Sequence, residues 1–538
     1  MSSISAKFKL SVIVAAFTLG SSMAVAVANP STSAALVRSA KPTGSITWGI
    51  TTQDESLDPG VLYSTDDNSI TFEECDSLLK FGTNDQLEPD LASSWKQTSP
   101  TTYVYNLVHN ARFWDGNPVT ATDVAFSINR LSSPKLASPL LSLVQAGSIK
   151  EAIANGKWQV IIKLSQANPI AKDLPATPIG QVVEKSAVEK WGSAFGSAPN
   201  KVMCSGPYRP VSYVKGATTV LDAVPNYWNK AALPTFKQIT FEQVNDAEAL
   251  IAGLRSGAIS GTFDLDARDA ITLEHDSNLD VQFVRYAGNS NFINPNLEKG
   301  PLANPLIRKA LSLAVNRSAL AYAIDGAEGE PLKDMETPAL FTDYRSLYLA
   351  AYNSLPNPIH SDIAAAKALI KEAHAQGTTV TIGIEDSLTS DTVSAELEAA
   401  GQAIGLKVEM VRLTSAAFDA TVYSGHCPSY DAVTGYWAPD FPTAAAEIVP
   451  PLASVYSNNS CYFSSTYNAL KAKWTASPNG SETQARATIA MMKLVADDYV
   501  YIPLYADPLV QVREVSLTGY TETQVWEYQP FAVELHFK

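Results

Sequence analysis

The chain has 538 residues, a formal net charge of −15 and 46% hydrophobic residues. This length exceeds what one hydrophobic core supports, so two or three lobes are expected, and the apolar content is sufficient to build them. The acidic balance argues against nucleic acid and anionic membrane surfaces as partners and favours neutral or cationic ligands.

The N-terminus has the pattern of a secretory signal peptide. Lys7 and Lys9 precede an apolar run that starts at Leu10, and small residues up to Ala28 form a cleavage site. Residues 1–28 are therefore expected to be a cleaved signal, with an uncleaved membrane anchor as the alternative. Both interpretations place the rest of the chain in a periplasmic or other extracytoplasmic compartment.

Residues 29–44 are small and polar, which is typical of a flexible leader. No cysteine precedes Cys75, so the thiol of a lipoprotein anchor is missing and a protein that is not lipid-anchored is expected.

Four cysteines in a secreted chain form an even set, for which disulfides are the default interpretation. Three pairings are possible, and we favour Cys427 with Cys461 and therefore Cys75 with Cys204. Free thiols or a metal site are the alternative, but no two cysteines show the close spacing of a zinc site.

The N-terminal half predicts short strands with few helices. Strands are expected over 45–50, 102–108 and 158–164, and a helix over 122–130 with Thr120 or Thr122 as its N-cap. This composition favours an α+β subdomain.

The C-terminal half predicts alternating helices and strands. Asn304 and Pro305 begin an amphipathic helix that extends to residue 324, and Ser361 caps a helix that reaches Gln376 before Gly377. A strand over 378–384, a helix over 391–404 and a strand over 406–413 follow. This succession is typical of an open α/β lobe. A helix over 482–498 and one strand-like run over 499–512 complete the prediction.

Signatures of catalysis, cofactors and metals are weak. The six histidines form no HExxH pair, and neither a P-loop nor a Gly-x-Gly-x-x-Gly after a strand is present. The segment DLDARD, residues 264–269, resembles half a calcium loop but lacks the glycine and glutamate that complete one. No catalytic residue, cofactor or metal is therefore expected, although two distant acids of a glycoside hydrolase stay an alternative.

Five stretches occur together in the order typical of one family: FWDGNPVTATDVAFSINR (113–130), CSGPYR (204–209), NYW (226–228), NPLIRKALSLAVNRSAL (304–320) and WAPDFP (437–442). Over nearly all of the mature sequence, the chain resembles the extracytoplasmic solute-binding proteins of ABC transporters, in the oligopeptide, dipeptide and nickel class called family 5. Most of these residues suit turns and packing. We expect Arg308, for example, to form a structural ion pair.

The resemblance implies an α/β, two-lobed periplasmic-binding-protein fold (Venus-flytrap, class II) with an extra α+β subdomain in lobe one. Lobe one is expected from 45–80, 200–290 and 505–538, the subdomain from 81–199, and lobe two from 291–504. Hinges are expected near 200–205, 286–292 and 503–507.

The stretch GYWAPDF, residues 435–441, is the ligand-binding candidate. In peptide-binding relatives, the acid at the position of Asp440 receives the α-ammonium of the peptide, and the aromatic at the position of Trp437 lines the same site. Tyr436 and Phe441 are further aromatic candidates for cation–π contact. The alternative for Asp440 is a turn residue that accepts a hydrogen bond from its own backbone. Relatives often have Gly where Tyr436 stands, and Pro439 removes a backbone donor.

The expected function is that of the extracytoplasmic solute-binding component of an ABC importer. A monomer is expected to capture a peptide between two lobes and to present it to a membrane permease with its ATPase subunits. An oligosaccharide, a nickel complex or another small metabolite is an alternative solute. A sensor that delivers its complex to a receptor, and a secreted hydrolase on a similar fold, are alternatives of other classes.

Overall fold

The structure is a computed structural model that describes residues 42–538 except 53–55, 83–85, 264, 286–288, 342, 388, 423–426, 438–443, 445–459 and 521–525. Ser39–Lys538 forms one compact unit. Across the described parts of the chain, each helix is too short or too polar to cross a membrane.

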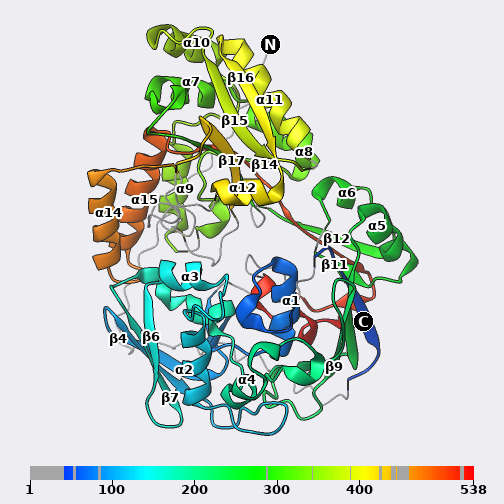
Figure 1. The fold of residues 1–538 in the computed structure, drawn as a ribbon. Coiled ribbons are helices and arrows are strands. Elements are labelled where there is room, and N and C mark those ends of the chain that lie inside the picture. Colours follow the sequence, from blue (N-terminus) through cyan, green and yellow to red (C-terminus); the bar gives the residue numbers. More distant parts are fainter. Residues whose placement is uncertain are drawn as a thin grey trace, which may run out of the picture. The chain divides into compact units, whose positions relative to one another are not determined.

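A seven-stranded mixed sheet collects strands from three distant parts of the sequence (Figure 1). Its order is β12 (Leu279–Val284), β19 (Leu509–Glu514), β11 (Gly261–Thr262), β1 (Ser45–Ile50), β10 (Gln238–Gln243), β9 (Thr218–Ala223) and β8 (Tyr208–Val214). β1 runs parallel to β10 and β11, whereas the other neighbours are antiparallel. Helices α5 (Ala247–Ser256) and α6 (Ala267–Ile271) bury apolar residues against β12 and β19.

In a second core cluster of this sheet, the aromatic rings of Trp48, Phe263 and Phe531 contact one another. Helix α1 (Thr65–Glu74) is buried along almost its whole length. The chain after β1 is fixed to the start of α1, because the carboxylate of Asp66 accepts hydrogen bonds from the backbone N–H groups of Thr51 and Thr52 at 3.1 and 2.7 Å.

A four-stranded antiparallel sheet forms a second part of the N-terminal half. Its order is β4 (Ala92–Ser99), β5 (Thr102–Leu107), β7 (Gln159–Leu164) and β6 (Ile149–Ala154). Helix α2 (Ala121–Arg130) begins with a capping box, in which Thr120 and Asp123 satisfy backbone donors reciprocally. The helices α3 (Leu141–Ala146) and α4 (Lys185–Trp191) and the small sheet of β2 (Leu79–Phe81) and β3 (Leu87–Pro89) complete this region.

A six-stranded mixed sheet forms the C-terminal half. Its order is β14 (Glu330–Pro331), β18 (Ile502–Ala506), β13 (Ser290–Pro295), β17 (Ala432–Trp437), β15 (Thr379–Glu385) and β16 (Lys407–Leu413). Four helices pack on it through one apolar core: α7 (Pro305–Ala314), α8 (Arg317–Asp325), α10 (Ile363–Glu372) and α11 (Ser390–Ile404). The other α-helices and strands of the described residues are α9 (Arg345–Asn353), α12 (Ser415–Val422), α14 (Ser465–Ala476), α15 (Glu482–Asp497), and the pair β20 (Leu517–Thr518) and β21 (His536–Phe537).

The predicted helix over 304–324 is two helices. Asn304 is the N-cap and Pro305 the first helical residue, as expected, but α7 ends at Ala314 and α8 begins at Arg317. Asn316 caps α8 by accepting from the N–H of Ala319 at 3.2 Å. The apolar spacing continues across this break, so periodicity alone does not reveal it.

Three smaller predictions also need correction. The helix that begins after residue 361 is capped by Asp362 rather than Ser361 and ends at Glu372. Arg308 forms no salt bridge with a described acid; its guanidinium donates to the backbone carbonyls of Leu302, Ala303 and Asp498 at 2.8–2.9 Å.

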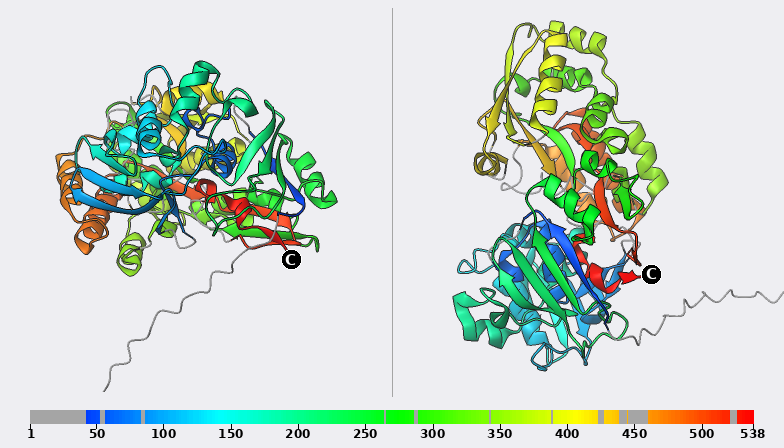
Figure 2. Two further views of the ribbon diagram at one scale, coloured as in Figure 1. Left: turned by 90° about the horizontal axis from the view of Figure 1, so that it is seen from below. Right: turned by 90° about the vertical axis from the view of Figure 1, so that its right-hand side faces the viewer.

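The third correction concerns the strand-like run over 499–512, which is two strands in two different sheets. β18 pairs in the six-stranded sheet and β19 in the seven-stranded sheet, and both are red in Figures 1 and 2. β12 and β13 make a second crossing between the same sheets, and the N–H of Asp507 donates to the carbonyl of Asn289 at 3.0 Å. Of the predicted hinges, 503–507 falls at the end of β18 where the chain crosses to β19, and the described part of 286–292 comprises Asn289 and the first residues of β13. Hinge motion itself and the predicted segment boundaries stay predictions.

Both favoured disulfide pairings are present. Cys75 is joined to Cys204 across 129 residues, and Cys427 to Cys461 across 34 residues. Cys75 and Cys204 are fully buried.

Candidate functional site

A cavity of about 920 Å³ lies between the two large sheets, beside the crossovers. This volume is at the upper end of the range of small-molecule sites, roughly 300–1,000 Å³. In both sheets the cavity adjoins the carboxyl ends of strands, where ligands of open α/β sheets commonly bind.

The six-stranded sheet contributes the ends of neighbouring strands. β13 runs antiparallel to β17 and β18, so its first residues lie beside the last residues of both: Asn291 is opposite Tyr436 in β17 and Tyr505 in β18. β15 runs parallel to β17, which brings Glu385 to the same edge. Because of this topology, residues more than 200 positions apart line one wall.

The seven-stranded sheet contributes the segments that follow β1 and β11. Thr51 follows β1, and its position is fixed by the carboxylate of Asp66. β11 leads through Phe263 to Asp266 and Arg268 at the start of α6. The Nε of Arg268 donates to the carbonyl of Ile324 at 3.3 Å, which links α6 directly to the end of α8 beside the cavity.

Of the four predicted ligand-binding residues, Tyr436 lines this cavity. Its side chain is 37% exposed, and its ring stacks on Phe418, with ring centroids 6.1 Å apart. Trp437 is half-buried and packs against the large core cluster instead of lining the cavity. Asp440 and Phe441 lie outside the described residues. The ligand-binding role of all four stays a prediction.

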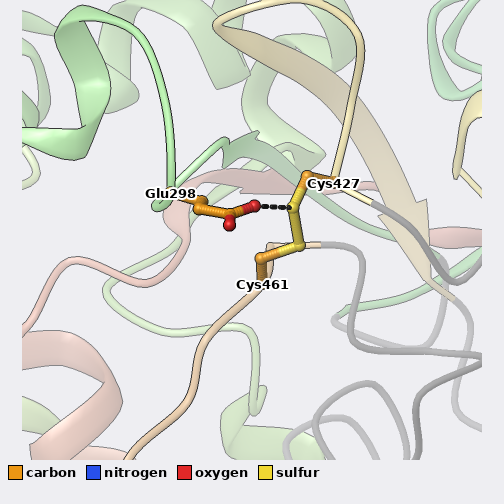
Figure 3. A group of neighbouring side chains, drawn as sticks. All are labelled: Glu298, Cys427 and Cys461. Atoms are coloured by element: carbon orange, nitrogen blue, oxygen red, sulfur yellow. Dashed lines mark hydrogen bonds between the residues drawn. A yellow bond between two sulfur atoms is a disulfide. The ribbon is translucent and has the colours of Figure 1, made fainter.

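The Cys427–Cys461 disulfide lies beside Glu298 (Figure 3). An oxygen of Glu298 is 3.3 Å from the Sγ of Cys427, and within the described part of the chain this is the one set of metal-type ligands that gathers closely. Both sulfurs are bonded to each other, so they offer no thiolate to a metal ion. The arrangement is a structural crosslink.

The cavity is strongly acidic. Seven carboxylates line it, from Asp266, Asp269, Asp325, Glu385, Asp386, Asp507 and Glu527, whereas Arg268 is the one lysine, arginine or histidine among its described lining residues. Asp386 is paired with Arg412 at 3.0 Å, and Glu527 accepts from Asn68 at 3.1 Å.

Among the seven acids that line the cavity, Asp325 and Asp507 are neighbours, and their carboxyl groups share a hydrogen bond. Burial, together with the neighbouring charge of Asp507, raises the pKa of Asp325 to about 8. Burial also raises the pKa of Asp507 to about 6, opposed by the hydrogen bond from Asn291. The pair therefore retains a proton at neutral pH in the empty cavity.

Sequence reasoning did not single out Asp325 or Asp507. Asp507 had a usable signal, since Asp507-Pro508 interrupts an apolar run and marks the change of sheet. Asp266 and Asp269 stood within the segment compared with a calcium loop, but Asp325 has no motif around it. Its place in the cavity comes from the packing of α8 against β18.

The comparisons with known proteins agree on one family. The family model of bacterial extracellular solute-binding proteins, family 5, matches residues 86–459. The periplasmic oligopeptide-binding protein OppA of Escherichia coli K12 is 23% identical over 491 residues, which cover 87% of this chain and 88% of OppA.

Two solved structures illustrate the likeness in fold. DppA from Helicobacter pylori, in complex with the peptide STSA, superposes with a TM-score of 0.76 at 19% identity and covers 92% of this chain and 98% of its own. AgaA from A. tumefaciens R10, in complex with agropinic acid, gives 0.75 at 19% identity, with 92% and 99% covered. The α/β, two-lobed fold expected from the sequence is thereby confirmed. The chain belongs to the bacterial extracellular solute-binding proteins of family 5.

Proposed function

We propose that this chain binds a peptide in the 920 Å³ cavity and delivers it to an ABC importer. The observation that carries this proposal is the position of the cavity, which is lined from both sheets at the strands that cross between them. A ligand held from both sides favours closure, because closing adds contacts that the open form lacks.

The splaying of β15 from β17 supports a peptide as the solute. The two strands pair at Ile382 with Ala432 and at Gly383 with Val433, and the described residues beyond these have no pairing between the two strands. Thr434–Tyr436 and Glu385 line the cavity where the strands separate. An extended peptide can pair with such an exposed strand edge through main-chain hydrogen bonds, which tolerate varied side chains.

The comparisons favour a peptide over other solutes. OppA is named as an oligopeptide-binding protein, and DppA was solved with a peptide. AgaA was solved with agropinic acid, so the same fold also accommodates a non-peptide solute. Among the candidates, the strand edge makes a peptide the best match.

The remaining parts of the proposal concern partners and location. A membrane permease with its ATPase subunits receives the loaded monomer, residues 1–28 direct export to the periplasm, and no catalysis takes place. The periplasmic location is supported by OppA, which is named as a periplasmic protein. Conversion of a bound peptide by the purified chain would contradict the non-catalytic role.

Mass spectrometry of ligands released from the purified chain by gentle denaturation tests the solute class. A mixed pool of short peptides is expected. A pool of sugars, or of one non-peptide metabolite, would overturn the peptide assignment while leaving the binding role intact.

Asp440→Asn tests the predicted ammonium contact. Affinity for free-amine peptides should fall by roughly tenfold or more, because a charge-assisted hydrogen bond is lost, whereas N-acetylated peptides should be unaffected. Equal losses for both kinds of peptide, or none for either, would refute the role of Asp440.

A further inference from the structure

One segment at the end of α8 is held by residues from the other half of the molecule. The segment comprises residues 324–330 and leads from α8 through a short 3-10 helix into β14, the edge strand of the six-stranded sheet. Its contacts come from α6 and from the end of β12, both of which belong with the seven-stranded sheet. The halves built on the two sheets therefore touch here as well as at the strands that cross between them.

Arg285 makes the ionic part of this contact. It directly follows β12, and its guanidinium donates to the Oε1 of Glu330 at 2.7 Å and to the carbonyl of Ala327 at 3.3 Å. An oxygen of Glu328 lies 3.2 Å from the same guanidinium. Because a guanidinium presents its donors in a fixed plane, one arginine can hold two carboxylates and a carbonyl together. Arg285 thus fixes the second part of the segment to the end of β12.

Helix α6 contacts the first part of the same segment. The Nε of Arg268 donates to the carbonyl of Ile324 at 3.3 Å. Close to this bond, Ile271 approaches Gly326, where φ is +63° and an added Cβ atom would lie 3.1 Å from the Cδ1 of Ile271. Glycine suits this position because it adopts a positive φ without steric cost and leaves room for the neighbouring side chain. The segment is therefore held along its length by residues of the seven-stranded half.

We propose that Arg268 and Arg285 form a latch that holds the 324–330 segment against the seven-stranded half and biases the two halves toward the joined arrangement. The segment is continuous with the cavity wall, which includes Ile324 and Asp325, and β14 pairs with the end of β18 at the crossover. Separation of the halves breaks the latch, so its contacts shift the equilibrium between joined and separated forms. The inference concerns the joint itself and is independent of which solute the cavity holds.

The ionic part of the latch should respond to salt. The side chain of Arg285 is 52% exposed, so mobile ions reach its ion pairs and screen them as the ionic strength rises. Exposed ion pairs are individually weak, but the balance between two arrangements of one chain changes with small energies. Loss of both ion pairs should increase the ratio of separated to joined molecules by roughly twofold to tenfold.

Double electron–electron resonance on the purified chain measures this separation. Nitroxide labels are attached at Ala252→Cys in α5 and Tyr322→Cys in α8, two exposed positions on either side of the latch. The native cysteines are all in disulfides, so the labels attach at the introduced thiols alone. Raising sodium chloride from about 0.05 M to about 1 M should shift part of the distance distribution toward longer distances, because the ion pairs are screened.

Variants in the doubly labelled chain assign the shift to the latch. Arg285→Met should increase the long-distance fraction by roughly twofold or more at low salt and remove its dependence on salt. Arg268→Met should also increase this fraction but retain the salt dependence, because Arg268 donates to a neutral carbonyl. Arg486→Met is the matched control: the side chain of Arg486 is 59% exposed and pairs with Glu482 within α15, so the distances should stay unchanged.

Exchange of charges separates ion pairing from any other structural role of Arg285. Glu330→Arg alone should increase the long-distance fraction, because two cations then face each other, and the addition of Arg285→Glu should restore it toward the wild-type value. The same distance distribution in wild type, in Arg285→Met and at high salt would overturn the latch. Failure of the charge exchange to restore the distribution, or an equal shift in Arg486→Met, would overturn it as well.

Discussion

Replacement of Arg317 by methionine is expected to destabilise the chain strongly. Arg317 is fully buried at the break between α7 and α8. Its guanidinium donates to the carbonyls of Pro503, Ser312 and Pro358 at 2.6, 2.8 and 2.9 Å, and to the Oγ of Ser312 at 2.8 Å. The Ser312 carbonyl is in the last turn of α7, where helix carbonyls lack an intrahelical donor, and Arg317 supplies that donor. Its bond to the carbonyl of Pro503 also connects this turn to β18.

The magnitude follows from these contacts. Three carbonyls, of which those of Pro503 and Ser312 are buried and that of Pro358 is partly buried, would lose their donor at about 2 kcal/mol each, or about 6 kcal/mol together. Burial lowers the pKa of Arg317 from 12.5 to about 10. Removing the charge therefore recovers about 3 kcal/mol. The expected net loss is about 3 kcal/mol, which is large for a single substitution and is typical of breaking a buried hydrogen-bond network.

Urea unfolding, followed by tryptophan fluorescence and circular dichroism, measures this loss. Arg317→Lys should lie between wild type and Arg317→Met, because an ammonium keeps the charge but cannot reach the same acceptors. Arg412→Met removes a half-exposed arginine that pairs with Asp386 and Asp391, and should cost less than about 1 kcal/mol. A loss below about 1 kcal/mol for Arg317→Met, or equal losses at positions 317 and 412, would refute the reasoning.

Two further predictions concern stability. Burial raises the folded-state pKa of Asp76 from 3.8 to about 6, against hydrogen bonds from Tyr227 and Trp228 at 2.6 Å. The folded state thus binds this proton more tightly than the unfolded state, so the free energy of unfolding should fall by about 3 kcal/mol as pH rises from about 4 through 6. Asp76→Asn should flatten that slope in urea titrations at pH 4–7, and an unchanged slope would exclude Asp76 as its source. Replacing both Cys75 and Cys204 by alanine should cost about 5 kcal/mol by chain entropy, against about 4 for the Cys427–Cys461 pair, because the closed loops span 129 and 34 residues. Equal losses for the two pairs, or a larger loss for Cys427–Cys461, would contradict the loop-length argument.

Local sequence signals predicted most individual elements. Thr120 and Asp123 define the start of α2, and Asn304 with Pro305 defines the start of α7, because caps depend on residues three or four positions apart. Errors arose where local and tertiary preferences differ. The break before Arg317 is stabilised by carbonyls of distant residues, and periodicity carries no information about them.

The candidate site shows the same difference between local sequence signals and tertiary packing. The GYWAPDF stretch predicted Tyr436 as a ligand-facing residue, and its side chain lines the cavity, whereas Trp437 points into the core because successive residues of a strand alternate between faces. The resemblance favoured Trp437, because relatives have the site-lining aromatic at that position and often have Gly where Tyr436 stands. The ligand-binding role of both residues stays a prediction.

The sequence by itself determined the family, the fold class and the expectation of disulfides, because these depend on motifs, composition and compartment. Which of the three possible cysteine pairings forms was only a preference until the tertiary structure decided it. Only the tertiary structure decided which acids meet. Asp266, Asp325 and Asp507 are separated by 59 and 182 positions in the sequence, and they share one cavity because α6, α8 and the β18–β19 crossover are brought together by two different sheets. Electrostatic interaction depends on distance in space and on burial, and neither can be read from the spacing of residues along the chain.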